Sequence, residues 1–366
     1  MQTQASLSSD QFSELLHRLP RDLDLDKLAW ETKAIERKRK IESGPNLLRL
    51  ALARGPGGLS LSETAAWATM LGFAQMSDPG VKYRLDKAVG FLKAVMNGQL
   101  AAKSAGASVR WAGRTLRACD GTCISKRGST GTDWRVHAVY DLGRGGFSHL
   151  DLTDGHGAEA IDRGAPVAGE IRIGDRNYAT ATSLQRFRQQ SAKQADFIVR
   201  VRWRGFSLNR TEGADFDLID YLGTLPHDEV PHEVTVQAKL GPLDPALPLR
   251  LVIRRKSPEA TEATRKKLHS EASRKQKTLD PRSLIAAEFM IVGTSLPVAG
   301  YPAEEILAVY RLRWQIELAF KRLKSLLHID RLPTRTEQAS RSWLYAHLIM
   351  ALLCDDLSQD FLESFP

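Results

Sequence analysis

The chain has few cysteines and no long apolar run, and these absences exclude several classes of protein. Three cysteines in 366 residues cannot form the disulfide framework that is typical of small secreted domains. Cys119 and Cys123 are close in sequence, but no second Cys/His cluster accompanies them. We therefore predict no zinc site and expect reduced, partly buried thiols. The longest apolar stretches, such as residues 344–353, are far shorter than the ~20 residues that a membrane span requires.

The sequence also shows no signal-peptide pattern in its first residues, no compositional bias and no internal repeats. Its first ten residues are polar and do not show the charged-then-apolar order of a signal peptide. Hydrophobic residues make up 42% and charged residues 26%, which excludes a largely disordered chain. We expect a cytoplasmic protein of two to three domains that does not contact a membrane.

Positive charge is modest in total but clustered. The formal net charge is +9 and the sequence pI is about 9.5. Basic clusters occur at residues 36–40, at 265–277 and at Arg200, Arg202 and Arg204. A single cluster is usually a solvated surface, but three in different segments favour a polyanionic partner, and nucleic acid is the first candidate.

Residues 1–108 are predicted to be helical. An apolar helix around residues 47–52 should end at Gly55, and Ser60 or Ser62 should cap the next helix. Ser77, followed by Asp78 and Pro79, predicts another helix start, and the helix that follows is basic. Two short helices with a basic second member resemble a helix-turn-helix, but a plain helical bundle explains the same pattern.

From about residue 109 the pattern changes to strands. Alternation predicts a three-stranded meander over residues 109–153, a fourth strand at 170–175, a helix at 181–193 and a fifth strand at 197–204. In the fifth strand, arginines are expected to occupy one face. Residues 205–298 appear as an insertion with strand signals near 234–238, 249–253 and 289–292, and a charged helix or linker at 258–277. One long helix is expected from Pro302 to about His328, followed by an apolar helix at 343–353.

The expected long helix carries the most informative pattern. At ~100° per residue, Tyr310, Arg313, Glu317 and Lys324 fall within an arc of about 60°, beside an apolar flank. A plain amphipathic helix with an Arg313–Glu317 ion pair, worth ~0.2–0.5 kcal/mol, would explain this pattern on its own.

Two upstream carboxylates favour a catalytic role for this helix edge over a plain amphipathic helix. Asp120 ends the first predicted strand and Asp175 ends the fourth, where open α/β sheets place their sites. A helix packed over the sheet could bring Glu317 to them. Three grouped carboxylates repel one another unless cations neutralise them. Magnesium prefers such hard oxygen ligands, and a pair of metal ions can catalyse phosphoryl transfer while nearby basic side chains hold the polyanion.

These residues resemble a known family. The spacing of Tyr310, Arg313, Glu317 and Lys324 matches the Y-x2-R-x3-E-x6-K signature of bacterial insertion-sequence transposases of the DDE type. Residues 118–122 (ACDGT) and 174–178 (GDRNY) are similar to the family's first and second aspartate motifs. Residues 152–159 and the N-terminal stretches 47–61 and 77–92 are similar to the family as well.

The resemblance implies an α/β protein with a ribonuclease-H-like catalytic core. It implies a helical DNA-binding domain at 1–108, core segments at 109–204 and 299–366, and a β-rich insertion at 205–298. The function implied is DNA cleavage at terminal inverted repeats and strand transfer into target DNA, by a dimer on DNA in the bacterial nucleoid.

The resemblance also implies roles for single residues. Asp120, Asp175 and Glu317 would be catalytic and bind two Mg²⁺ ions, with Mn²⁺ as a substitute. An aromatic residue of the insertion can cover a flipped base in the family, and Phe289 and Trp203 are the nearest candidates, although both fit a core equally. The residues expected to contact DNA are Tyr310, Arg313, Lys324, Arg176, Arg200 and Arg202.

Two alternatives stay open at this stage. One is a ribonuclease-H-like nuclease that cuts without strand transfer, and the other is a transposase-derived DNA-binding relic. The chain ends about forty residues after Lys324. Family members usually carry a longer C-terminal part for pairing subunits, so the chain resembles either a truncated copy or a naturally short member. We expect the chemistry to be intact and leave the pairing of subunits open.

Overall fold

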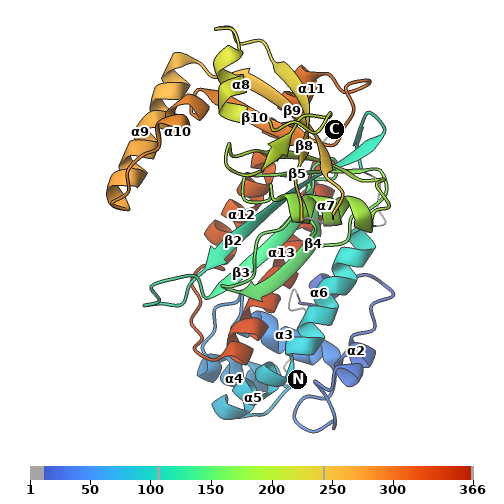
Figure 1. The fold of residues 1–366 in the computed structure, drawn as a ribbon. Coiled ribbons are helices and arrows are strands. Elements are labelled where there is room, and N and C mark those ends of the chain that lie inside the picture. The colour runs from blue at the N-terminus through green and yellow to red at the C-terminus, as the bar shows by residue number, and fades with distance from the viewer. Residues whose placement is uncertain (1–11, 105–107, 242–243, 364–366) are drawn as a thin grey trace, which may run out of the picture.

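The computed structural model describes residues 12–104, 108–241 and 244–363, which form a mixed α/β fold around a ten-stranded sheet (Figure 1). The strand order is β4-β3-β2-β5-β6-β10-β9-β8-β7, and β1 pairs with β2. The strands are β1 (Arg110–Trp111), β2 (Arg114–Ile124), β3 (Trp134–Asp141), β4 (Gly146–Asp154), β5 (Glu170–Gly174), β6 (Asp196–Arg200), β7 (Leu208–Asn209), β8 (His232–Ala238), β9 (Leu247–Arg255) and β10 (Phe289–Thr294).

The directions of the central strands place two of the predicted acids side by side. Strands β2, β3 and β4 form the expected antiparallel meander, whereas β5 runs parallel to β2 and β6 parallel to β5. Ala118 of β2 is in register with Ile173 of β5. Asp120 and Asp175 each lie two residues further on, so the register brings them to the same level of the sheet. Asp175 directly follows the end of β5, but Asp120 does not end its strand as predicted, because β2 continues to Ile124.

The fifth predicted strand is shorter than expected, and its arginine face is wrong. Strand β6 ends at Arg200, so Arg202 and Arg204 lie in the following turn. Ile198 is fully buried rather than exposed, because the face that it occupies is covered by α11 (Ala303–Arg311). A strand buried on both faces loses the alternation of polar and apolar residues.

The N-terminal region is helical, as the sequence predicts. Ser60 forms a capping box with Glu63 at the start of α4, and the preceding helix α3 ends at Gly55. The helices are α1 (Phe12–His17), α2 (Leu25–Glu31), α3 (Gly44–Arg54), α4 (Leu61–Met70), α5 (Asp78–Lys87) and α6 (Val89–Ser104).

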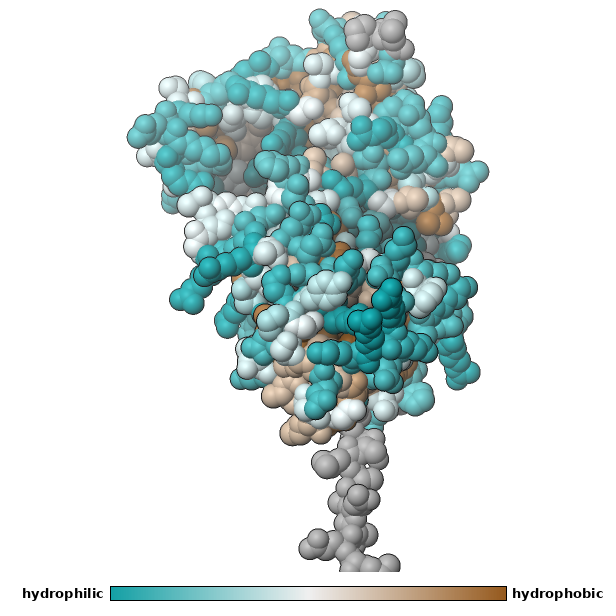
Figure 2. Space-filling view, turned by 90° about the horizontal axis from the view of Figure 1, so that it is seen from below, coloured by the Kyte–Doolittle hydropathy of each residue, from teal (hydrophilic) through white to brown (hydrophobic). Residues whose placement is uncertain are grey.

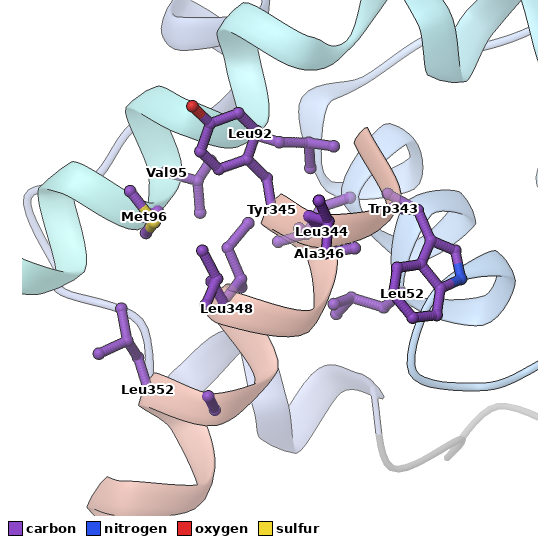
Figure 3. Close-up of a cluster of buried hydrophobic side chains, with 14 of the residues drawn as sticks. Leu52, Leu92, Val95, Met96, Trp343, Leu344, Tyr345, Ala346, Leu348 and Leu352 are labelled. Atoms are coloured by element: carbon purple, nitrogen blue, oxygen red, sulfur yellow. The ribbon is translucent and has the colours of Figure 1, made fainter. Parts of the chain in front are cut away.

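These helices share one hydrophobic core with the C-terminal helix α13 (Glu337–Glu363) and with β2, β3 and β4. In Figure 3, Leu344 and Leu348 of α13 lie among Leu92 and Val95 of α6 and Leu52 of α3. The apolar helix predicted at 343–353 is therefore part of a longer helix, which packs the C-terminal part of the chain against the N-terminal helices. Viewed from the end that carries α4 and α5, the surface is mostly hydrophilic (Figure 2).

The remaining helices are α7 (Ala181–Gln190), α8 (Leu218–Thr224), α9 (Pro258–Arg274), α10 (Pro281–Ala286), α11 and α12 (Trp314–Leu327). Of these, α9 projects away from the sheet (Figure 1). The single helix expected from Pro302 to His328 is wrong, because α11 and α12 are separate. At the junction, the Leu312 and Arg313 amides donate to the carbonyls of Val309 and Tyr310, at 3.0 and 3.2 Å. These i→i−3 bonds tighten the turn and end the first helix.

Neither of the two aromatic candidates for covering a flipped base is free on the surface. Phe289 is buried and Trp203 packs against the same core. The Trp203 ring lies under the guanidinium groups of Arg204 and Arg282. In the described part of the chain, no helix is both long enough and apolar enough to span a membrane.

Candidate active site

Asp120 and Glu317 meet around the guanidinium group of Arg313. Nη1 of Arg313 lies 3.7 Å from Oδ2 of Asp120, and Nη2 donates to Oε1 of Glu317. Arg313 comes from the junction between α11 and α12, Glu317 from the first turn of α12 and Asp120 from the middle of β2. The helix packs on β2, so residues almost two hundred positions apart form one cluster.

Asp120 carries an unfavourable charge in this position. Burial raises the pKa of its carboxyl to about 6, and the nearby negative charges of Asp175 and Glu317 act in the same direction. The Gly121 amide, which donates to Oδ1 at 2.8 Å, and the Arg313 guanidinium oppose this rise. The three predicted acids therefore interact electrostatically, and additional positive charge would stabilise the ionised form of Asp120.

Asp175 is held by the turn that follows β5. Its Oδ1 accepts a hydrogen bond from the Asn177 amide at 2.7 Å, which fixes the carboxylate at the strand end. The side-chain amide of Asn177 donates in turn to Oε2 of Glu159 at 3.0 Å.

Glu159 is an additional acid that the sequence analysis did not assign to the site. Its Oε1 would lie 3.1 Å from a Cβ at position 121, so glycine after Asp120 allows a close approach of the two segments. The buried hydroxyl of Tyr178 lies beside the same position and has no hydrogen-bond partner among the described residues. Residues 152–159 were singled out by similarity alone, and the only sequence signal for Glu159 was its place in that run.

Tyr310 and Arg200 complete the cluster on the side of α11. Burial raises the pKa of the Tyr310 hydroxyl, while the positive charges of Arg313 and Arg200 lower it and Asp175 raises it. In Arg313, burial lowers the pKa, but the hydrogen bond to Glu317 and the nearby Tyr310 and Asp120 outweigh this effect and raise it. On this side of the site, two arginines therefore lie within electrostatic range of the Tyr310 hydroxyl.

The other predicted DNA contacts lie at different places. Lys324 lines a cavity of about 490 Å³ together with Asp120 and Glu317. Arg202 is exposed and donates to Oδ1 of Asn177, so it is connected to the turn that holds Asp175. Arg176 is exposed on that turn, within electrostatic range of Glu271 on α9.

The residues of this site fit a divalent cation by their chemistry. Carboxylate oxygens are the ligands that such cations prefer, and the raised pKa of Asp120 marks a carboxylate that a cation would stabilise. In the part of the chain that the structure describes, no three His, Cys, Asp or Glu side chains are close enough together to hold a metal ion. Arg313 supplies the positive charge between Asp120 and Glu317 instead.

Comparison with known proteins identifies the family. The transposase DDE domain matches residues 111–353 of this chain. The putative transposase InsL for insertion sequence element IS186A of Escherichia coli K12 is 37% identical over 361 residues, which cover 98% of this chain and 96% of that protein. The transposase for insertion sequence element IS421 of Escherichia coli is also 37% identical, with the same shares covered.

More distant similarities have the same character. The transposase for insertion sequence element IS231E of Bacillus thuringiensis is 26% identical over 385 aligned positions, which cover 94% of this chain and 78% of that protein. Among solved structures, a piggyBac transposase in a synaptic complex with hairpin DNA aligns with a TM-score of 0.45 and 9% identity, over 96% of this chain and 73% of that chain. The domain match and the near full-length similarity at 37% identity lead to one conclusion: this chain belongs to the DDE transposase family.

Proposed function

We propose that this transposase cleaves DNA at the terminal inverted repeats of an insertion sequence and joins the freed ends to target DNA. The proposal rests on one observation above all: Asp120 and Glu317, from separate elements, both lie against Arg313, and Asp175 is within electrostatic range of Asp120. Its substrate would be double-stranded DNA in the bacterial cytoplasm, bound by a dimer at the nucleoid.

The order of the central strands supports a ribonuclease-H-like catalytic core. An antiparallel meander of three strands is followed by two strands parallel to its first member, in the order β4-β3-β2-β5-β6. We assign the core to residues 109–204 and 299–366, the insertion to 205–298 and a DNA-binding role to the helices of 1–108. The branch of the family with the Y-x2-R-x3-E-x6-K signature accounts for the positions of Tyr310, Arg313, Glu317 and Lys324.

Asp120, Asp175 and Glu317 would hold the divalent metal ions that DDE transposases generally use, and we propose two Mg²⁺ ions. Such ions, when bound, stabilise negative charge on the reacting phosphate and its oxygens. The residues of this chain do the rest. Arg313 holds Asp120 and Glu317 together in the absence of DNA and can turn toward a phosphate once those carboxylates have another cationic partner.

Lys324 and Arg200 would bind phosphates near the cut end. Lys324 lines the same cavity as Asp120, and Arg200 is half-buried within electrostatic range of Tyr310. Arg176 and Arg202 lie on or beside the turn that holds Asp175, from which they would contact the strand that leaves the site. Charge-assisted hydrogen bonds to phosphate oxygens would then fix the scissile bond against the carboxylates.

The experiment uses a duplex that carries the inverted repeats flanking the coding region, incubated with the full chain and Mg²⁺ or Mn²⁺. Nicking at the repeat boundary followed by joining to a plasmid supports the proposal. Random degradation indicates a nuclease without strand transfer, and a mobility shift without cleavage indicates a DNA-binding relic. Asp175→Asn and Glu317→Gln should abolish cleavage but preserve binding. Asp22→Asn, which changes an exposed aspartate in the N-terminal region, should leave both cleavage and binding unchanged.

A further inference from the structure

A second cavity continues the catalytic one along the surface. The catalytic cavity extends from Asp120 and Glu317 past Lys324 to Asp330, and its volume is about 490 Å³. A larger cavity of about 980 Å³ begins at the same Asp330 and extends to Arg335. We call the two together the basic groove, which is lined by the cations Lys321, Lys324, Lys126, Arg127, Arg331 and Arg335.

The walls of the basic groove are held together by backbone contacts. The loop between β2 and β3 forms an isolated parallel bridge, Lys126 to Leu332, with the segment that joins α12 to α13. In Figure 1 this loop and this segment lie on the same side of the molecule, beside the lower end of α12. Ile329 and Leu332 are buried and anchor the segment, and Asp133 accepts a hydrogen bond from the Lys126 amide at 2.7 Å. The groove is therefore a fixed feature of the fold.

The positive charge of the basic groove is largely uncompensated. Among the ion pairs of the described residues, only Lys126 of the six cations takes part, with Asp133 at 3.9 Å. Asp330 is the acid that lies between the two cavities. By contrast, several basic residues of the insertion have acidic partners, such as Arg265 with Glu288 and Lys275 with Glu271. Unpaired cations along a groove attract a polyanion more strongly than paired ones.

We propose that the basic groove binds the phosphate backbone of the DNA duplex that leads away from the cut site, and that Lys126, Arg127, Arg331 and Arg335 are its contacts. This inference rests on the proposed function, because it assumes that DNA enters the catalytic cavity. The cations are consecutive along the groove from the carboxylates outward, as a backbone path requires. The segments that supply them are about two hundred residues apart in sequence and meet only in the fold.

The proposed path ends at Arg335. The next cavity along the surface lies between α3, α5 and the start of α13, and Arg335 also lines it. Its other cations have intramolecular partners: Arg54 donates to the Leu59 carbonyl at 3.1 Å, and Lys82 pairs with Asp86. These groups are less available to phosphates.

The test measures how the affinity for a short fluorescent duplex of arbitrary sequence depends on salt. Each lost phosphate contact lowers the slope of log affinity against log salt by about 0.9. The double variants Lys126→Gln/Arg127→Gln and Arg331→Gln/Arg335→Gln should therefore each lower the slope by about two units. The charge-matched control is Arg110→Gln/Lys193→Gln. These two exposed cations lie near the N-terminal ends of β2 and β6, so the control should leave the slope unchanged.

A variant that binds DNA more tightly shows that misfolding does not explain the lower affinity of the groove variants. Asp330→Asn removes the acid between the two cavities and should tighten binding, which a damaged fold cannot do. If both groove variants bind like the control while the wild type binds and cuts DNA, the groove inference is overturned and the proposed function stands. If Lys266→Gln/Lys267→Gln on α9 lowers the slope instead, the duplex follows the insertion and the groove inference is also overturned. If the wild type neither binds nor cuts its repeat duplex, the proposed function fails.

Discussion

Asp120 should destabilise the metal-free protein at neutral pH, and Asp120→Asn should remove that cost. The side chain is about 20% exposed and lies beside two other carboxylates. Asparagine keeps the shape and can still accept the Gly121 hydrogen bond, but it carries no charge. The variant therefore mimics the protonated form at every pH.

The magnitude follows from linkage. The pKa of Asp120 rises from its ordinary 3.8 to about 6 in the folded chain, so the folded state binds a proton that the unfolded state has released. The stability that this proton contributes is complete below about pH 4 and is lost as the pH rises through about 6. Two pKa units correspond to roughly 3 kcal/mol. Partial exposure lowers this, so we expect about 1–3 kcal/mol.

Thermal unfolding in EDTA between pH 4 and pH 8 measures this effect. With about 2.1 cal/mol/K of unfolding entropy per residue, the gain for Asp120→Asn at pH 8 is a rise in Tm of about 1–4 °C. The gain should vanish near pH 4, and Asp22→Asn should show none at either pH. Mg²⁺ at pH 8 should raise the Tm of the wild type more than that of Asp120→Asn. A variant that is less stable than the wild type at pH 8, or a gain that does not change with pH, would refute the reasoning.

Three other substitutions test neighbouring contacts. Arg313→Ala removes a charge that lowers the pKa of Asp120, so the metal-free chain should lose stability at a higher pH in the same unfolding series; an unchanged midpoint would contradict this. Glu170→Gln breaks a buried pair with Arg172, both about 1% exposed or less, and should cost about 3–5 kcal/mol of unfolding free energy in urea titrations. Lys324→Ala should lower the salt slope of duplex binding by about one unit, and an unchanged slope would argue against a phosphate contact.

The sequence predicted most of the strands well because the local signals agree with the fold. The meander, the strand before Asp175 and the start of α4 at Ser60 follow from alternation and capping, which act over a few residues. The signature from Tyr310 to Lys324 pointed to one helical edge. The structure divides that edge between two helices at Leu312, where neither glycine nor proline gives a sequence signal.

The basic groove and Glu159 could not be predicted because both depend on tertiary contacts. Clusters of consecutive cations stand out in a sequence, yet those on α9 include intramolecular ion pairs. Lys126 and Arg127 are only a pair of cations in the sequence, and they line one cavity with Arg331 because the Lys126–Leu332 bridge joins the two segments. Similarly, Glu159 becomes an acid of the site because position 121 is a glycine. Local patterns show which residues can do chemistry, and packing decides which of them do it together.

The insertion also belongs to the architecture of the site. Its last strand, β10, pairs antiparallel with β6, with Val292 in register with Arg200. This pairing returns the chain to the sheet immediately before α11, whose Ile306 and Leu307 pack in the same core as Ile173. Because α11 leads through a tight turn into α12, the position of Glu317 depends on where β10 ends. The strands of the insertion therefore help to place the third acid beside Asp120, so a deletion of the insertion should remove catalysis even if every acid were retained.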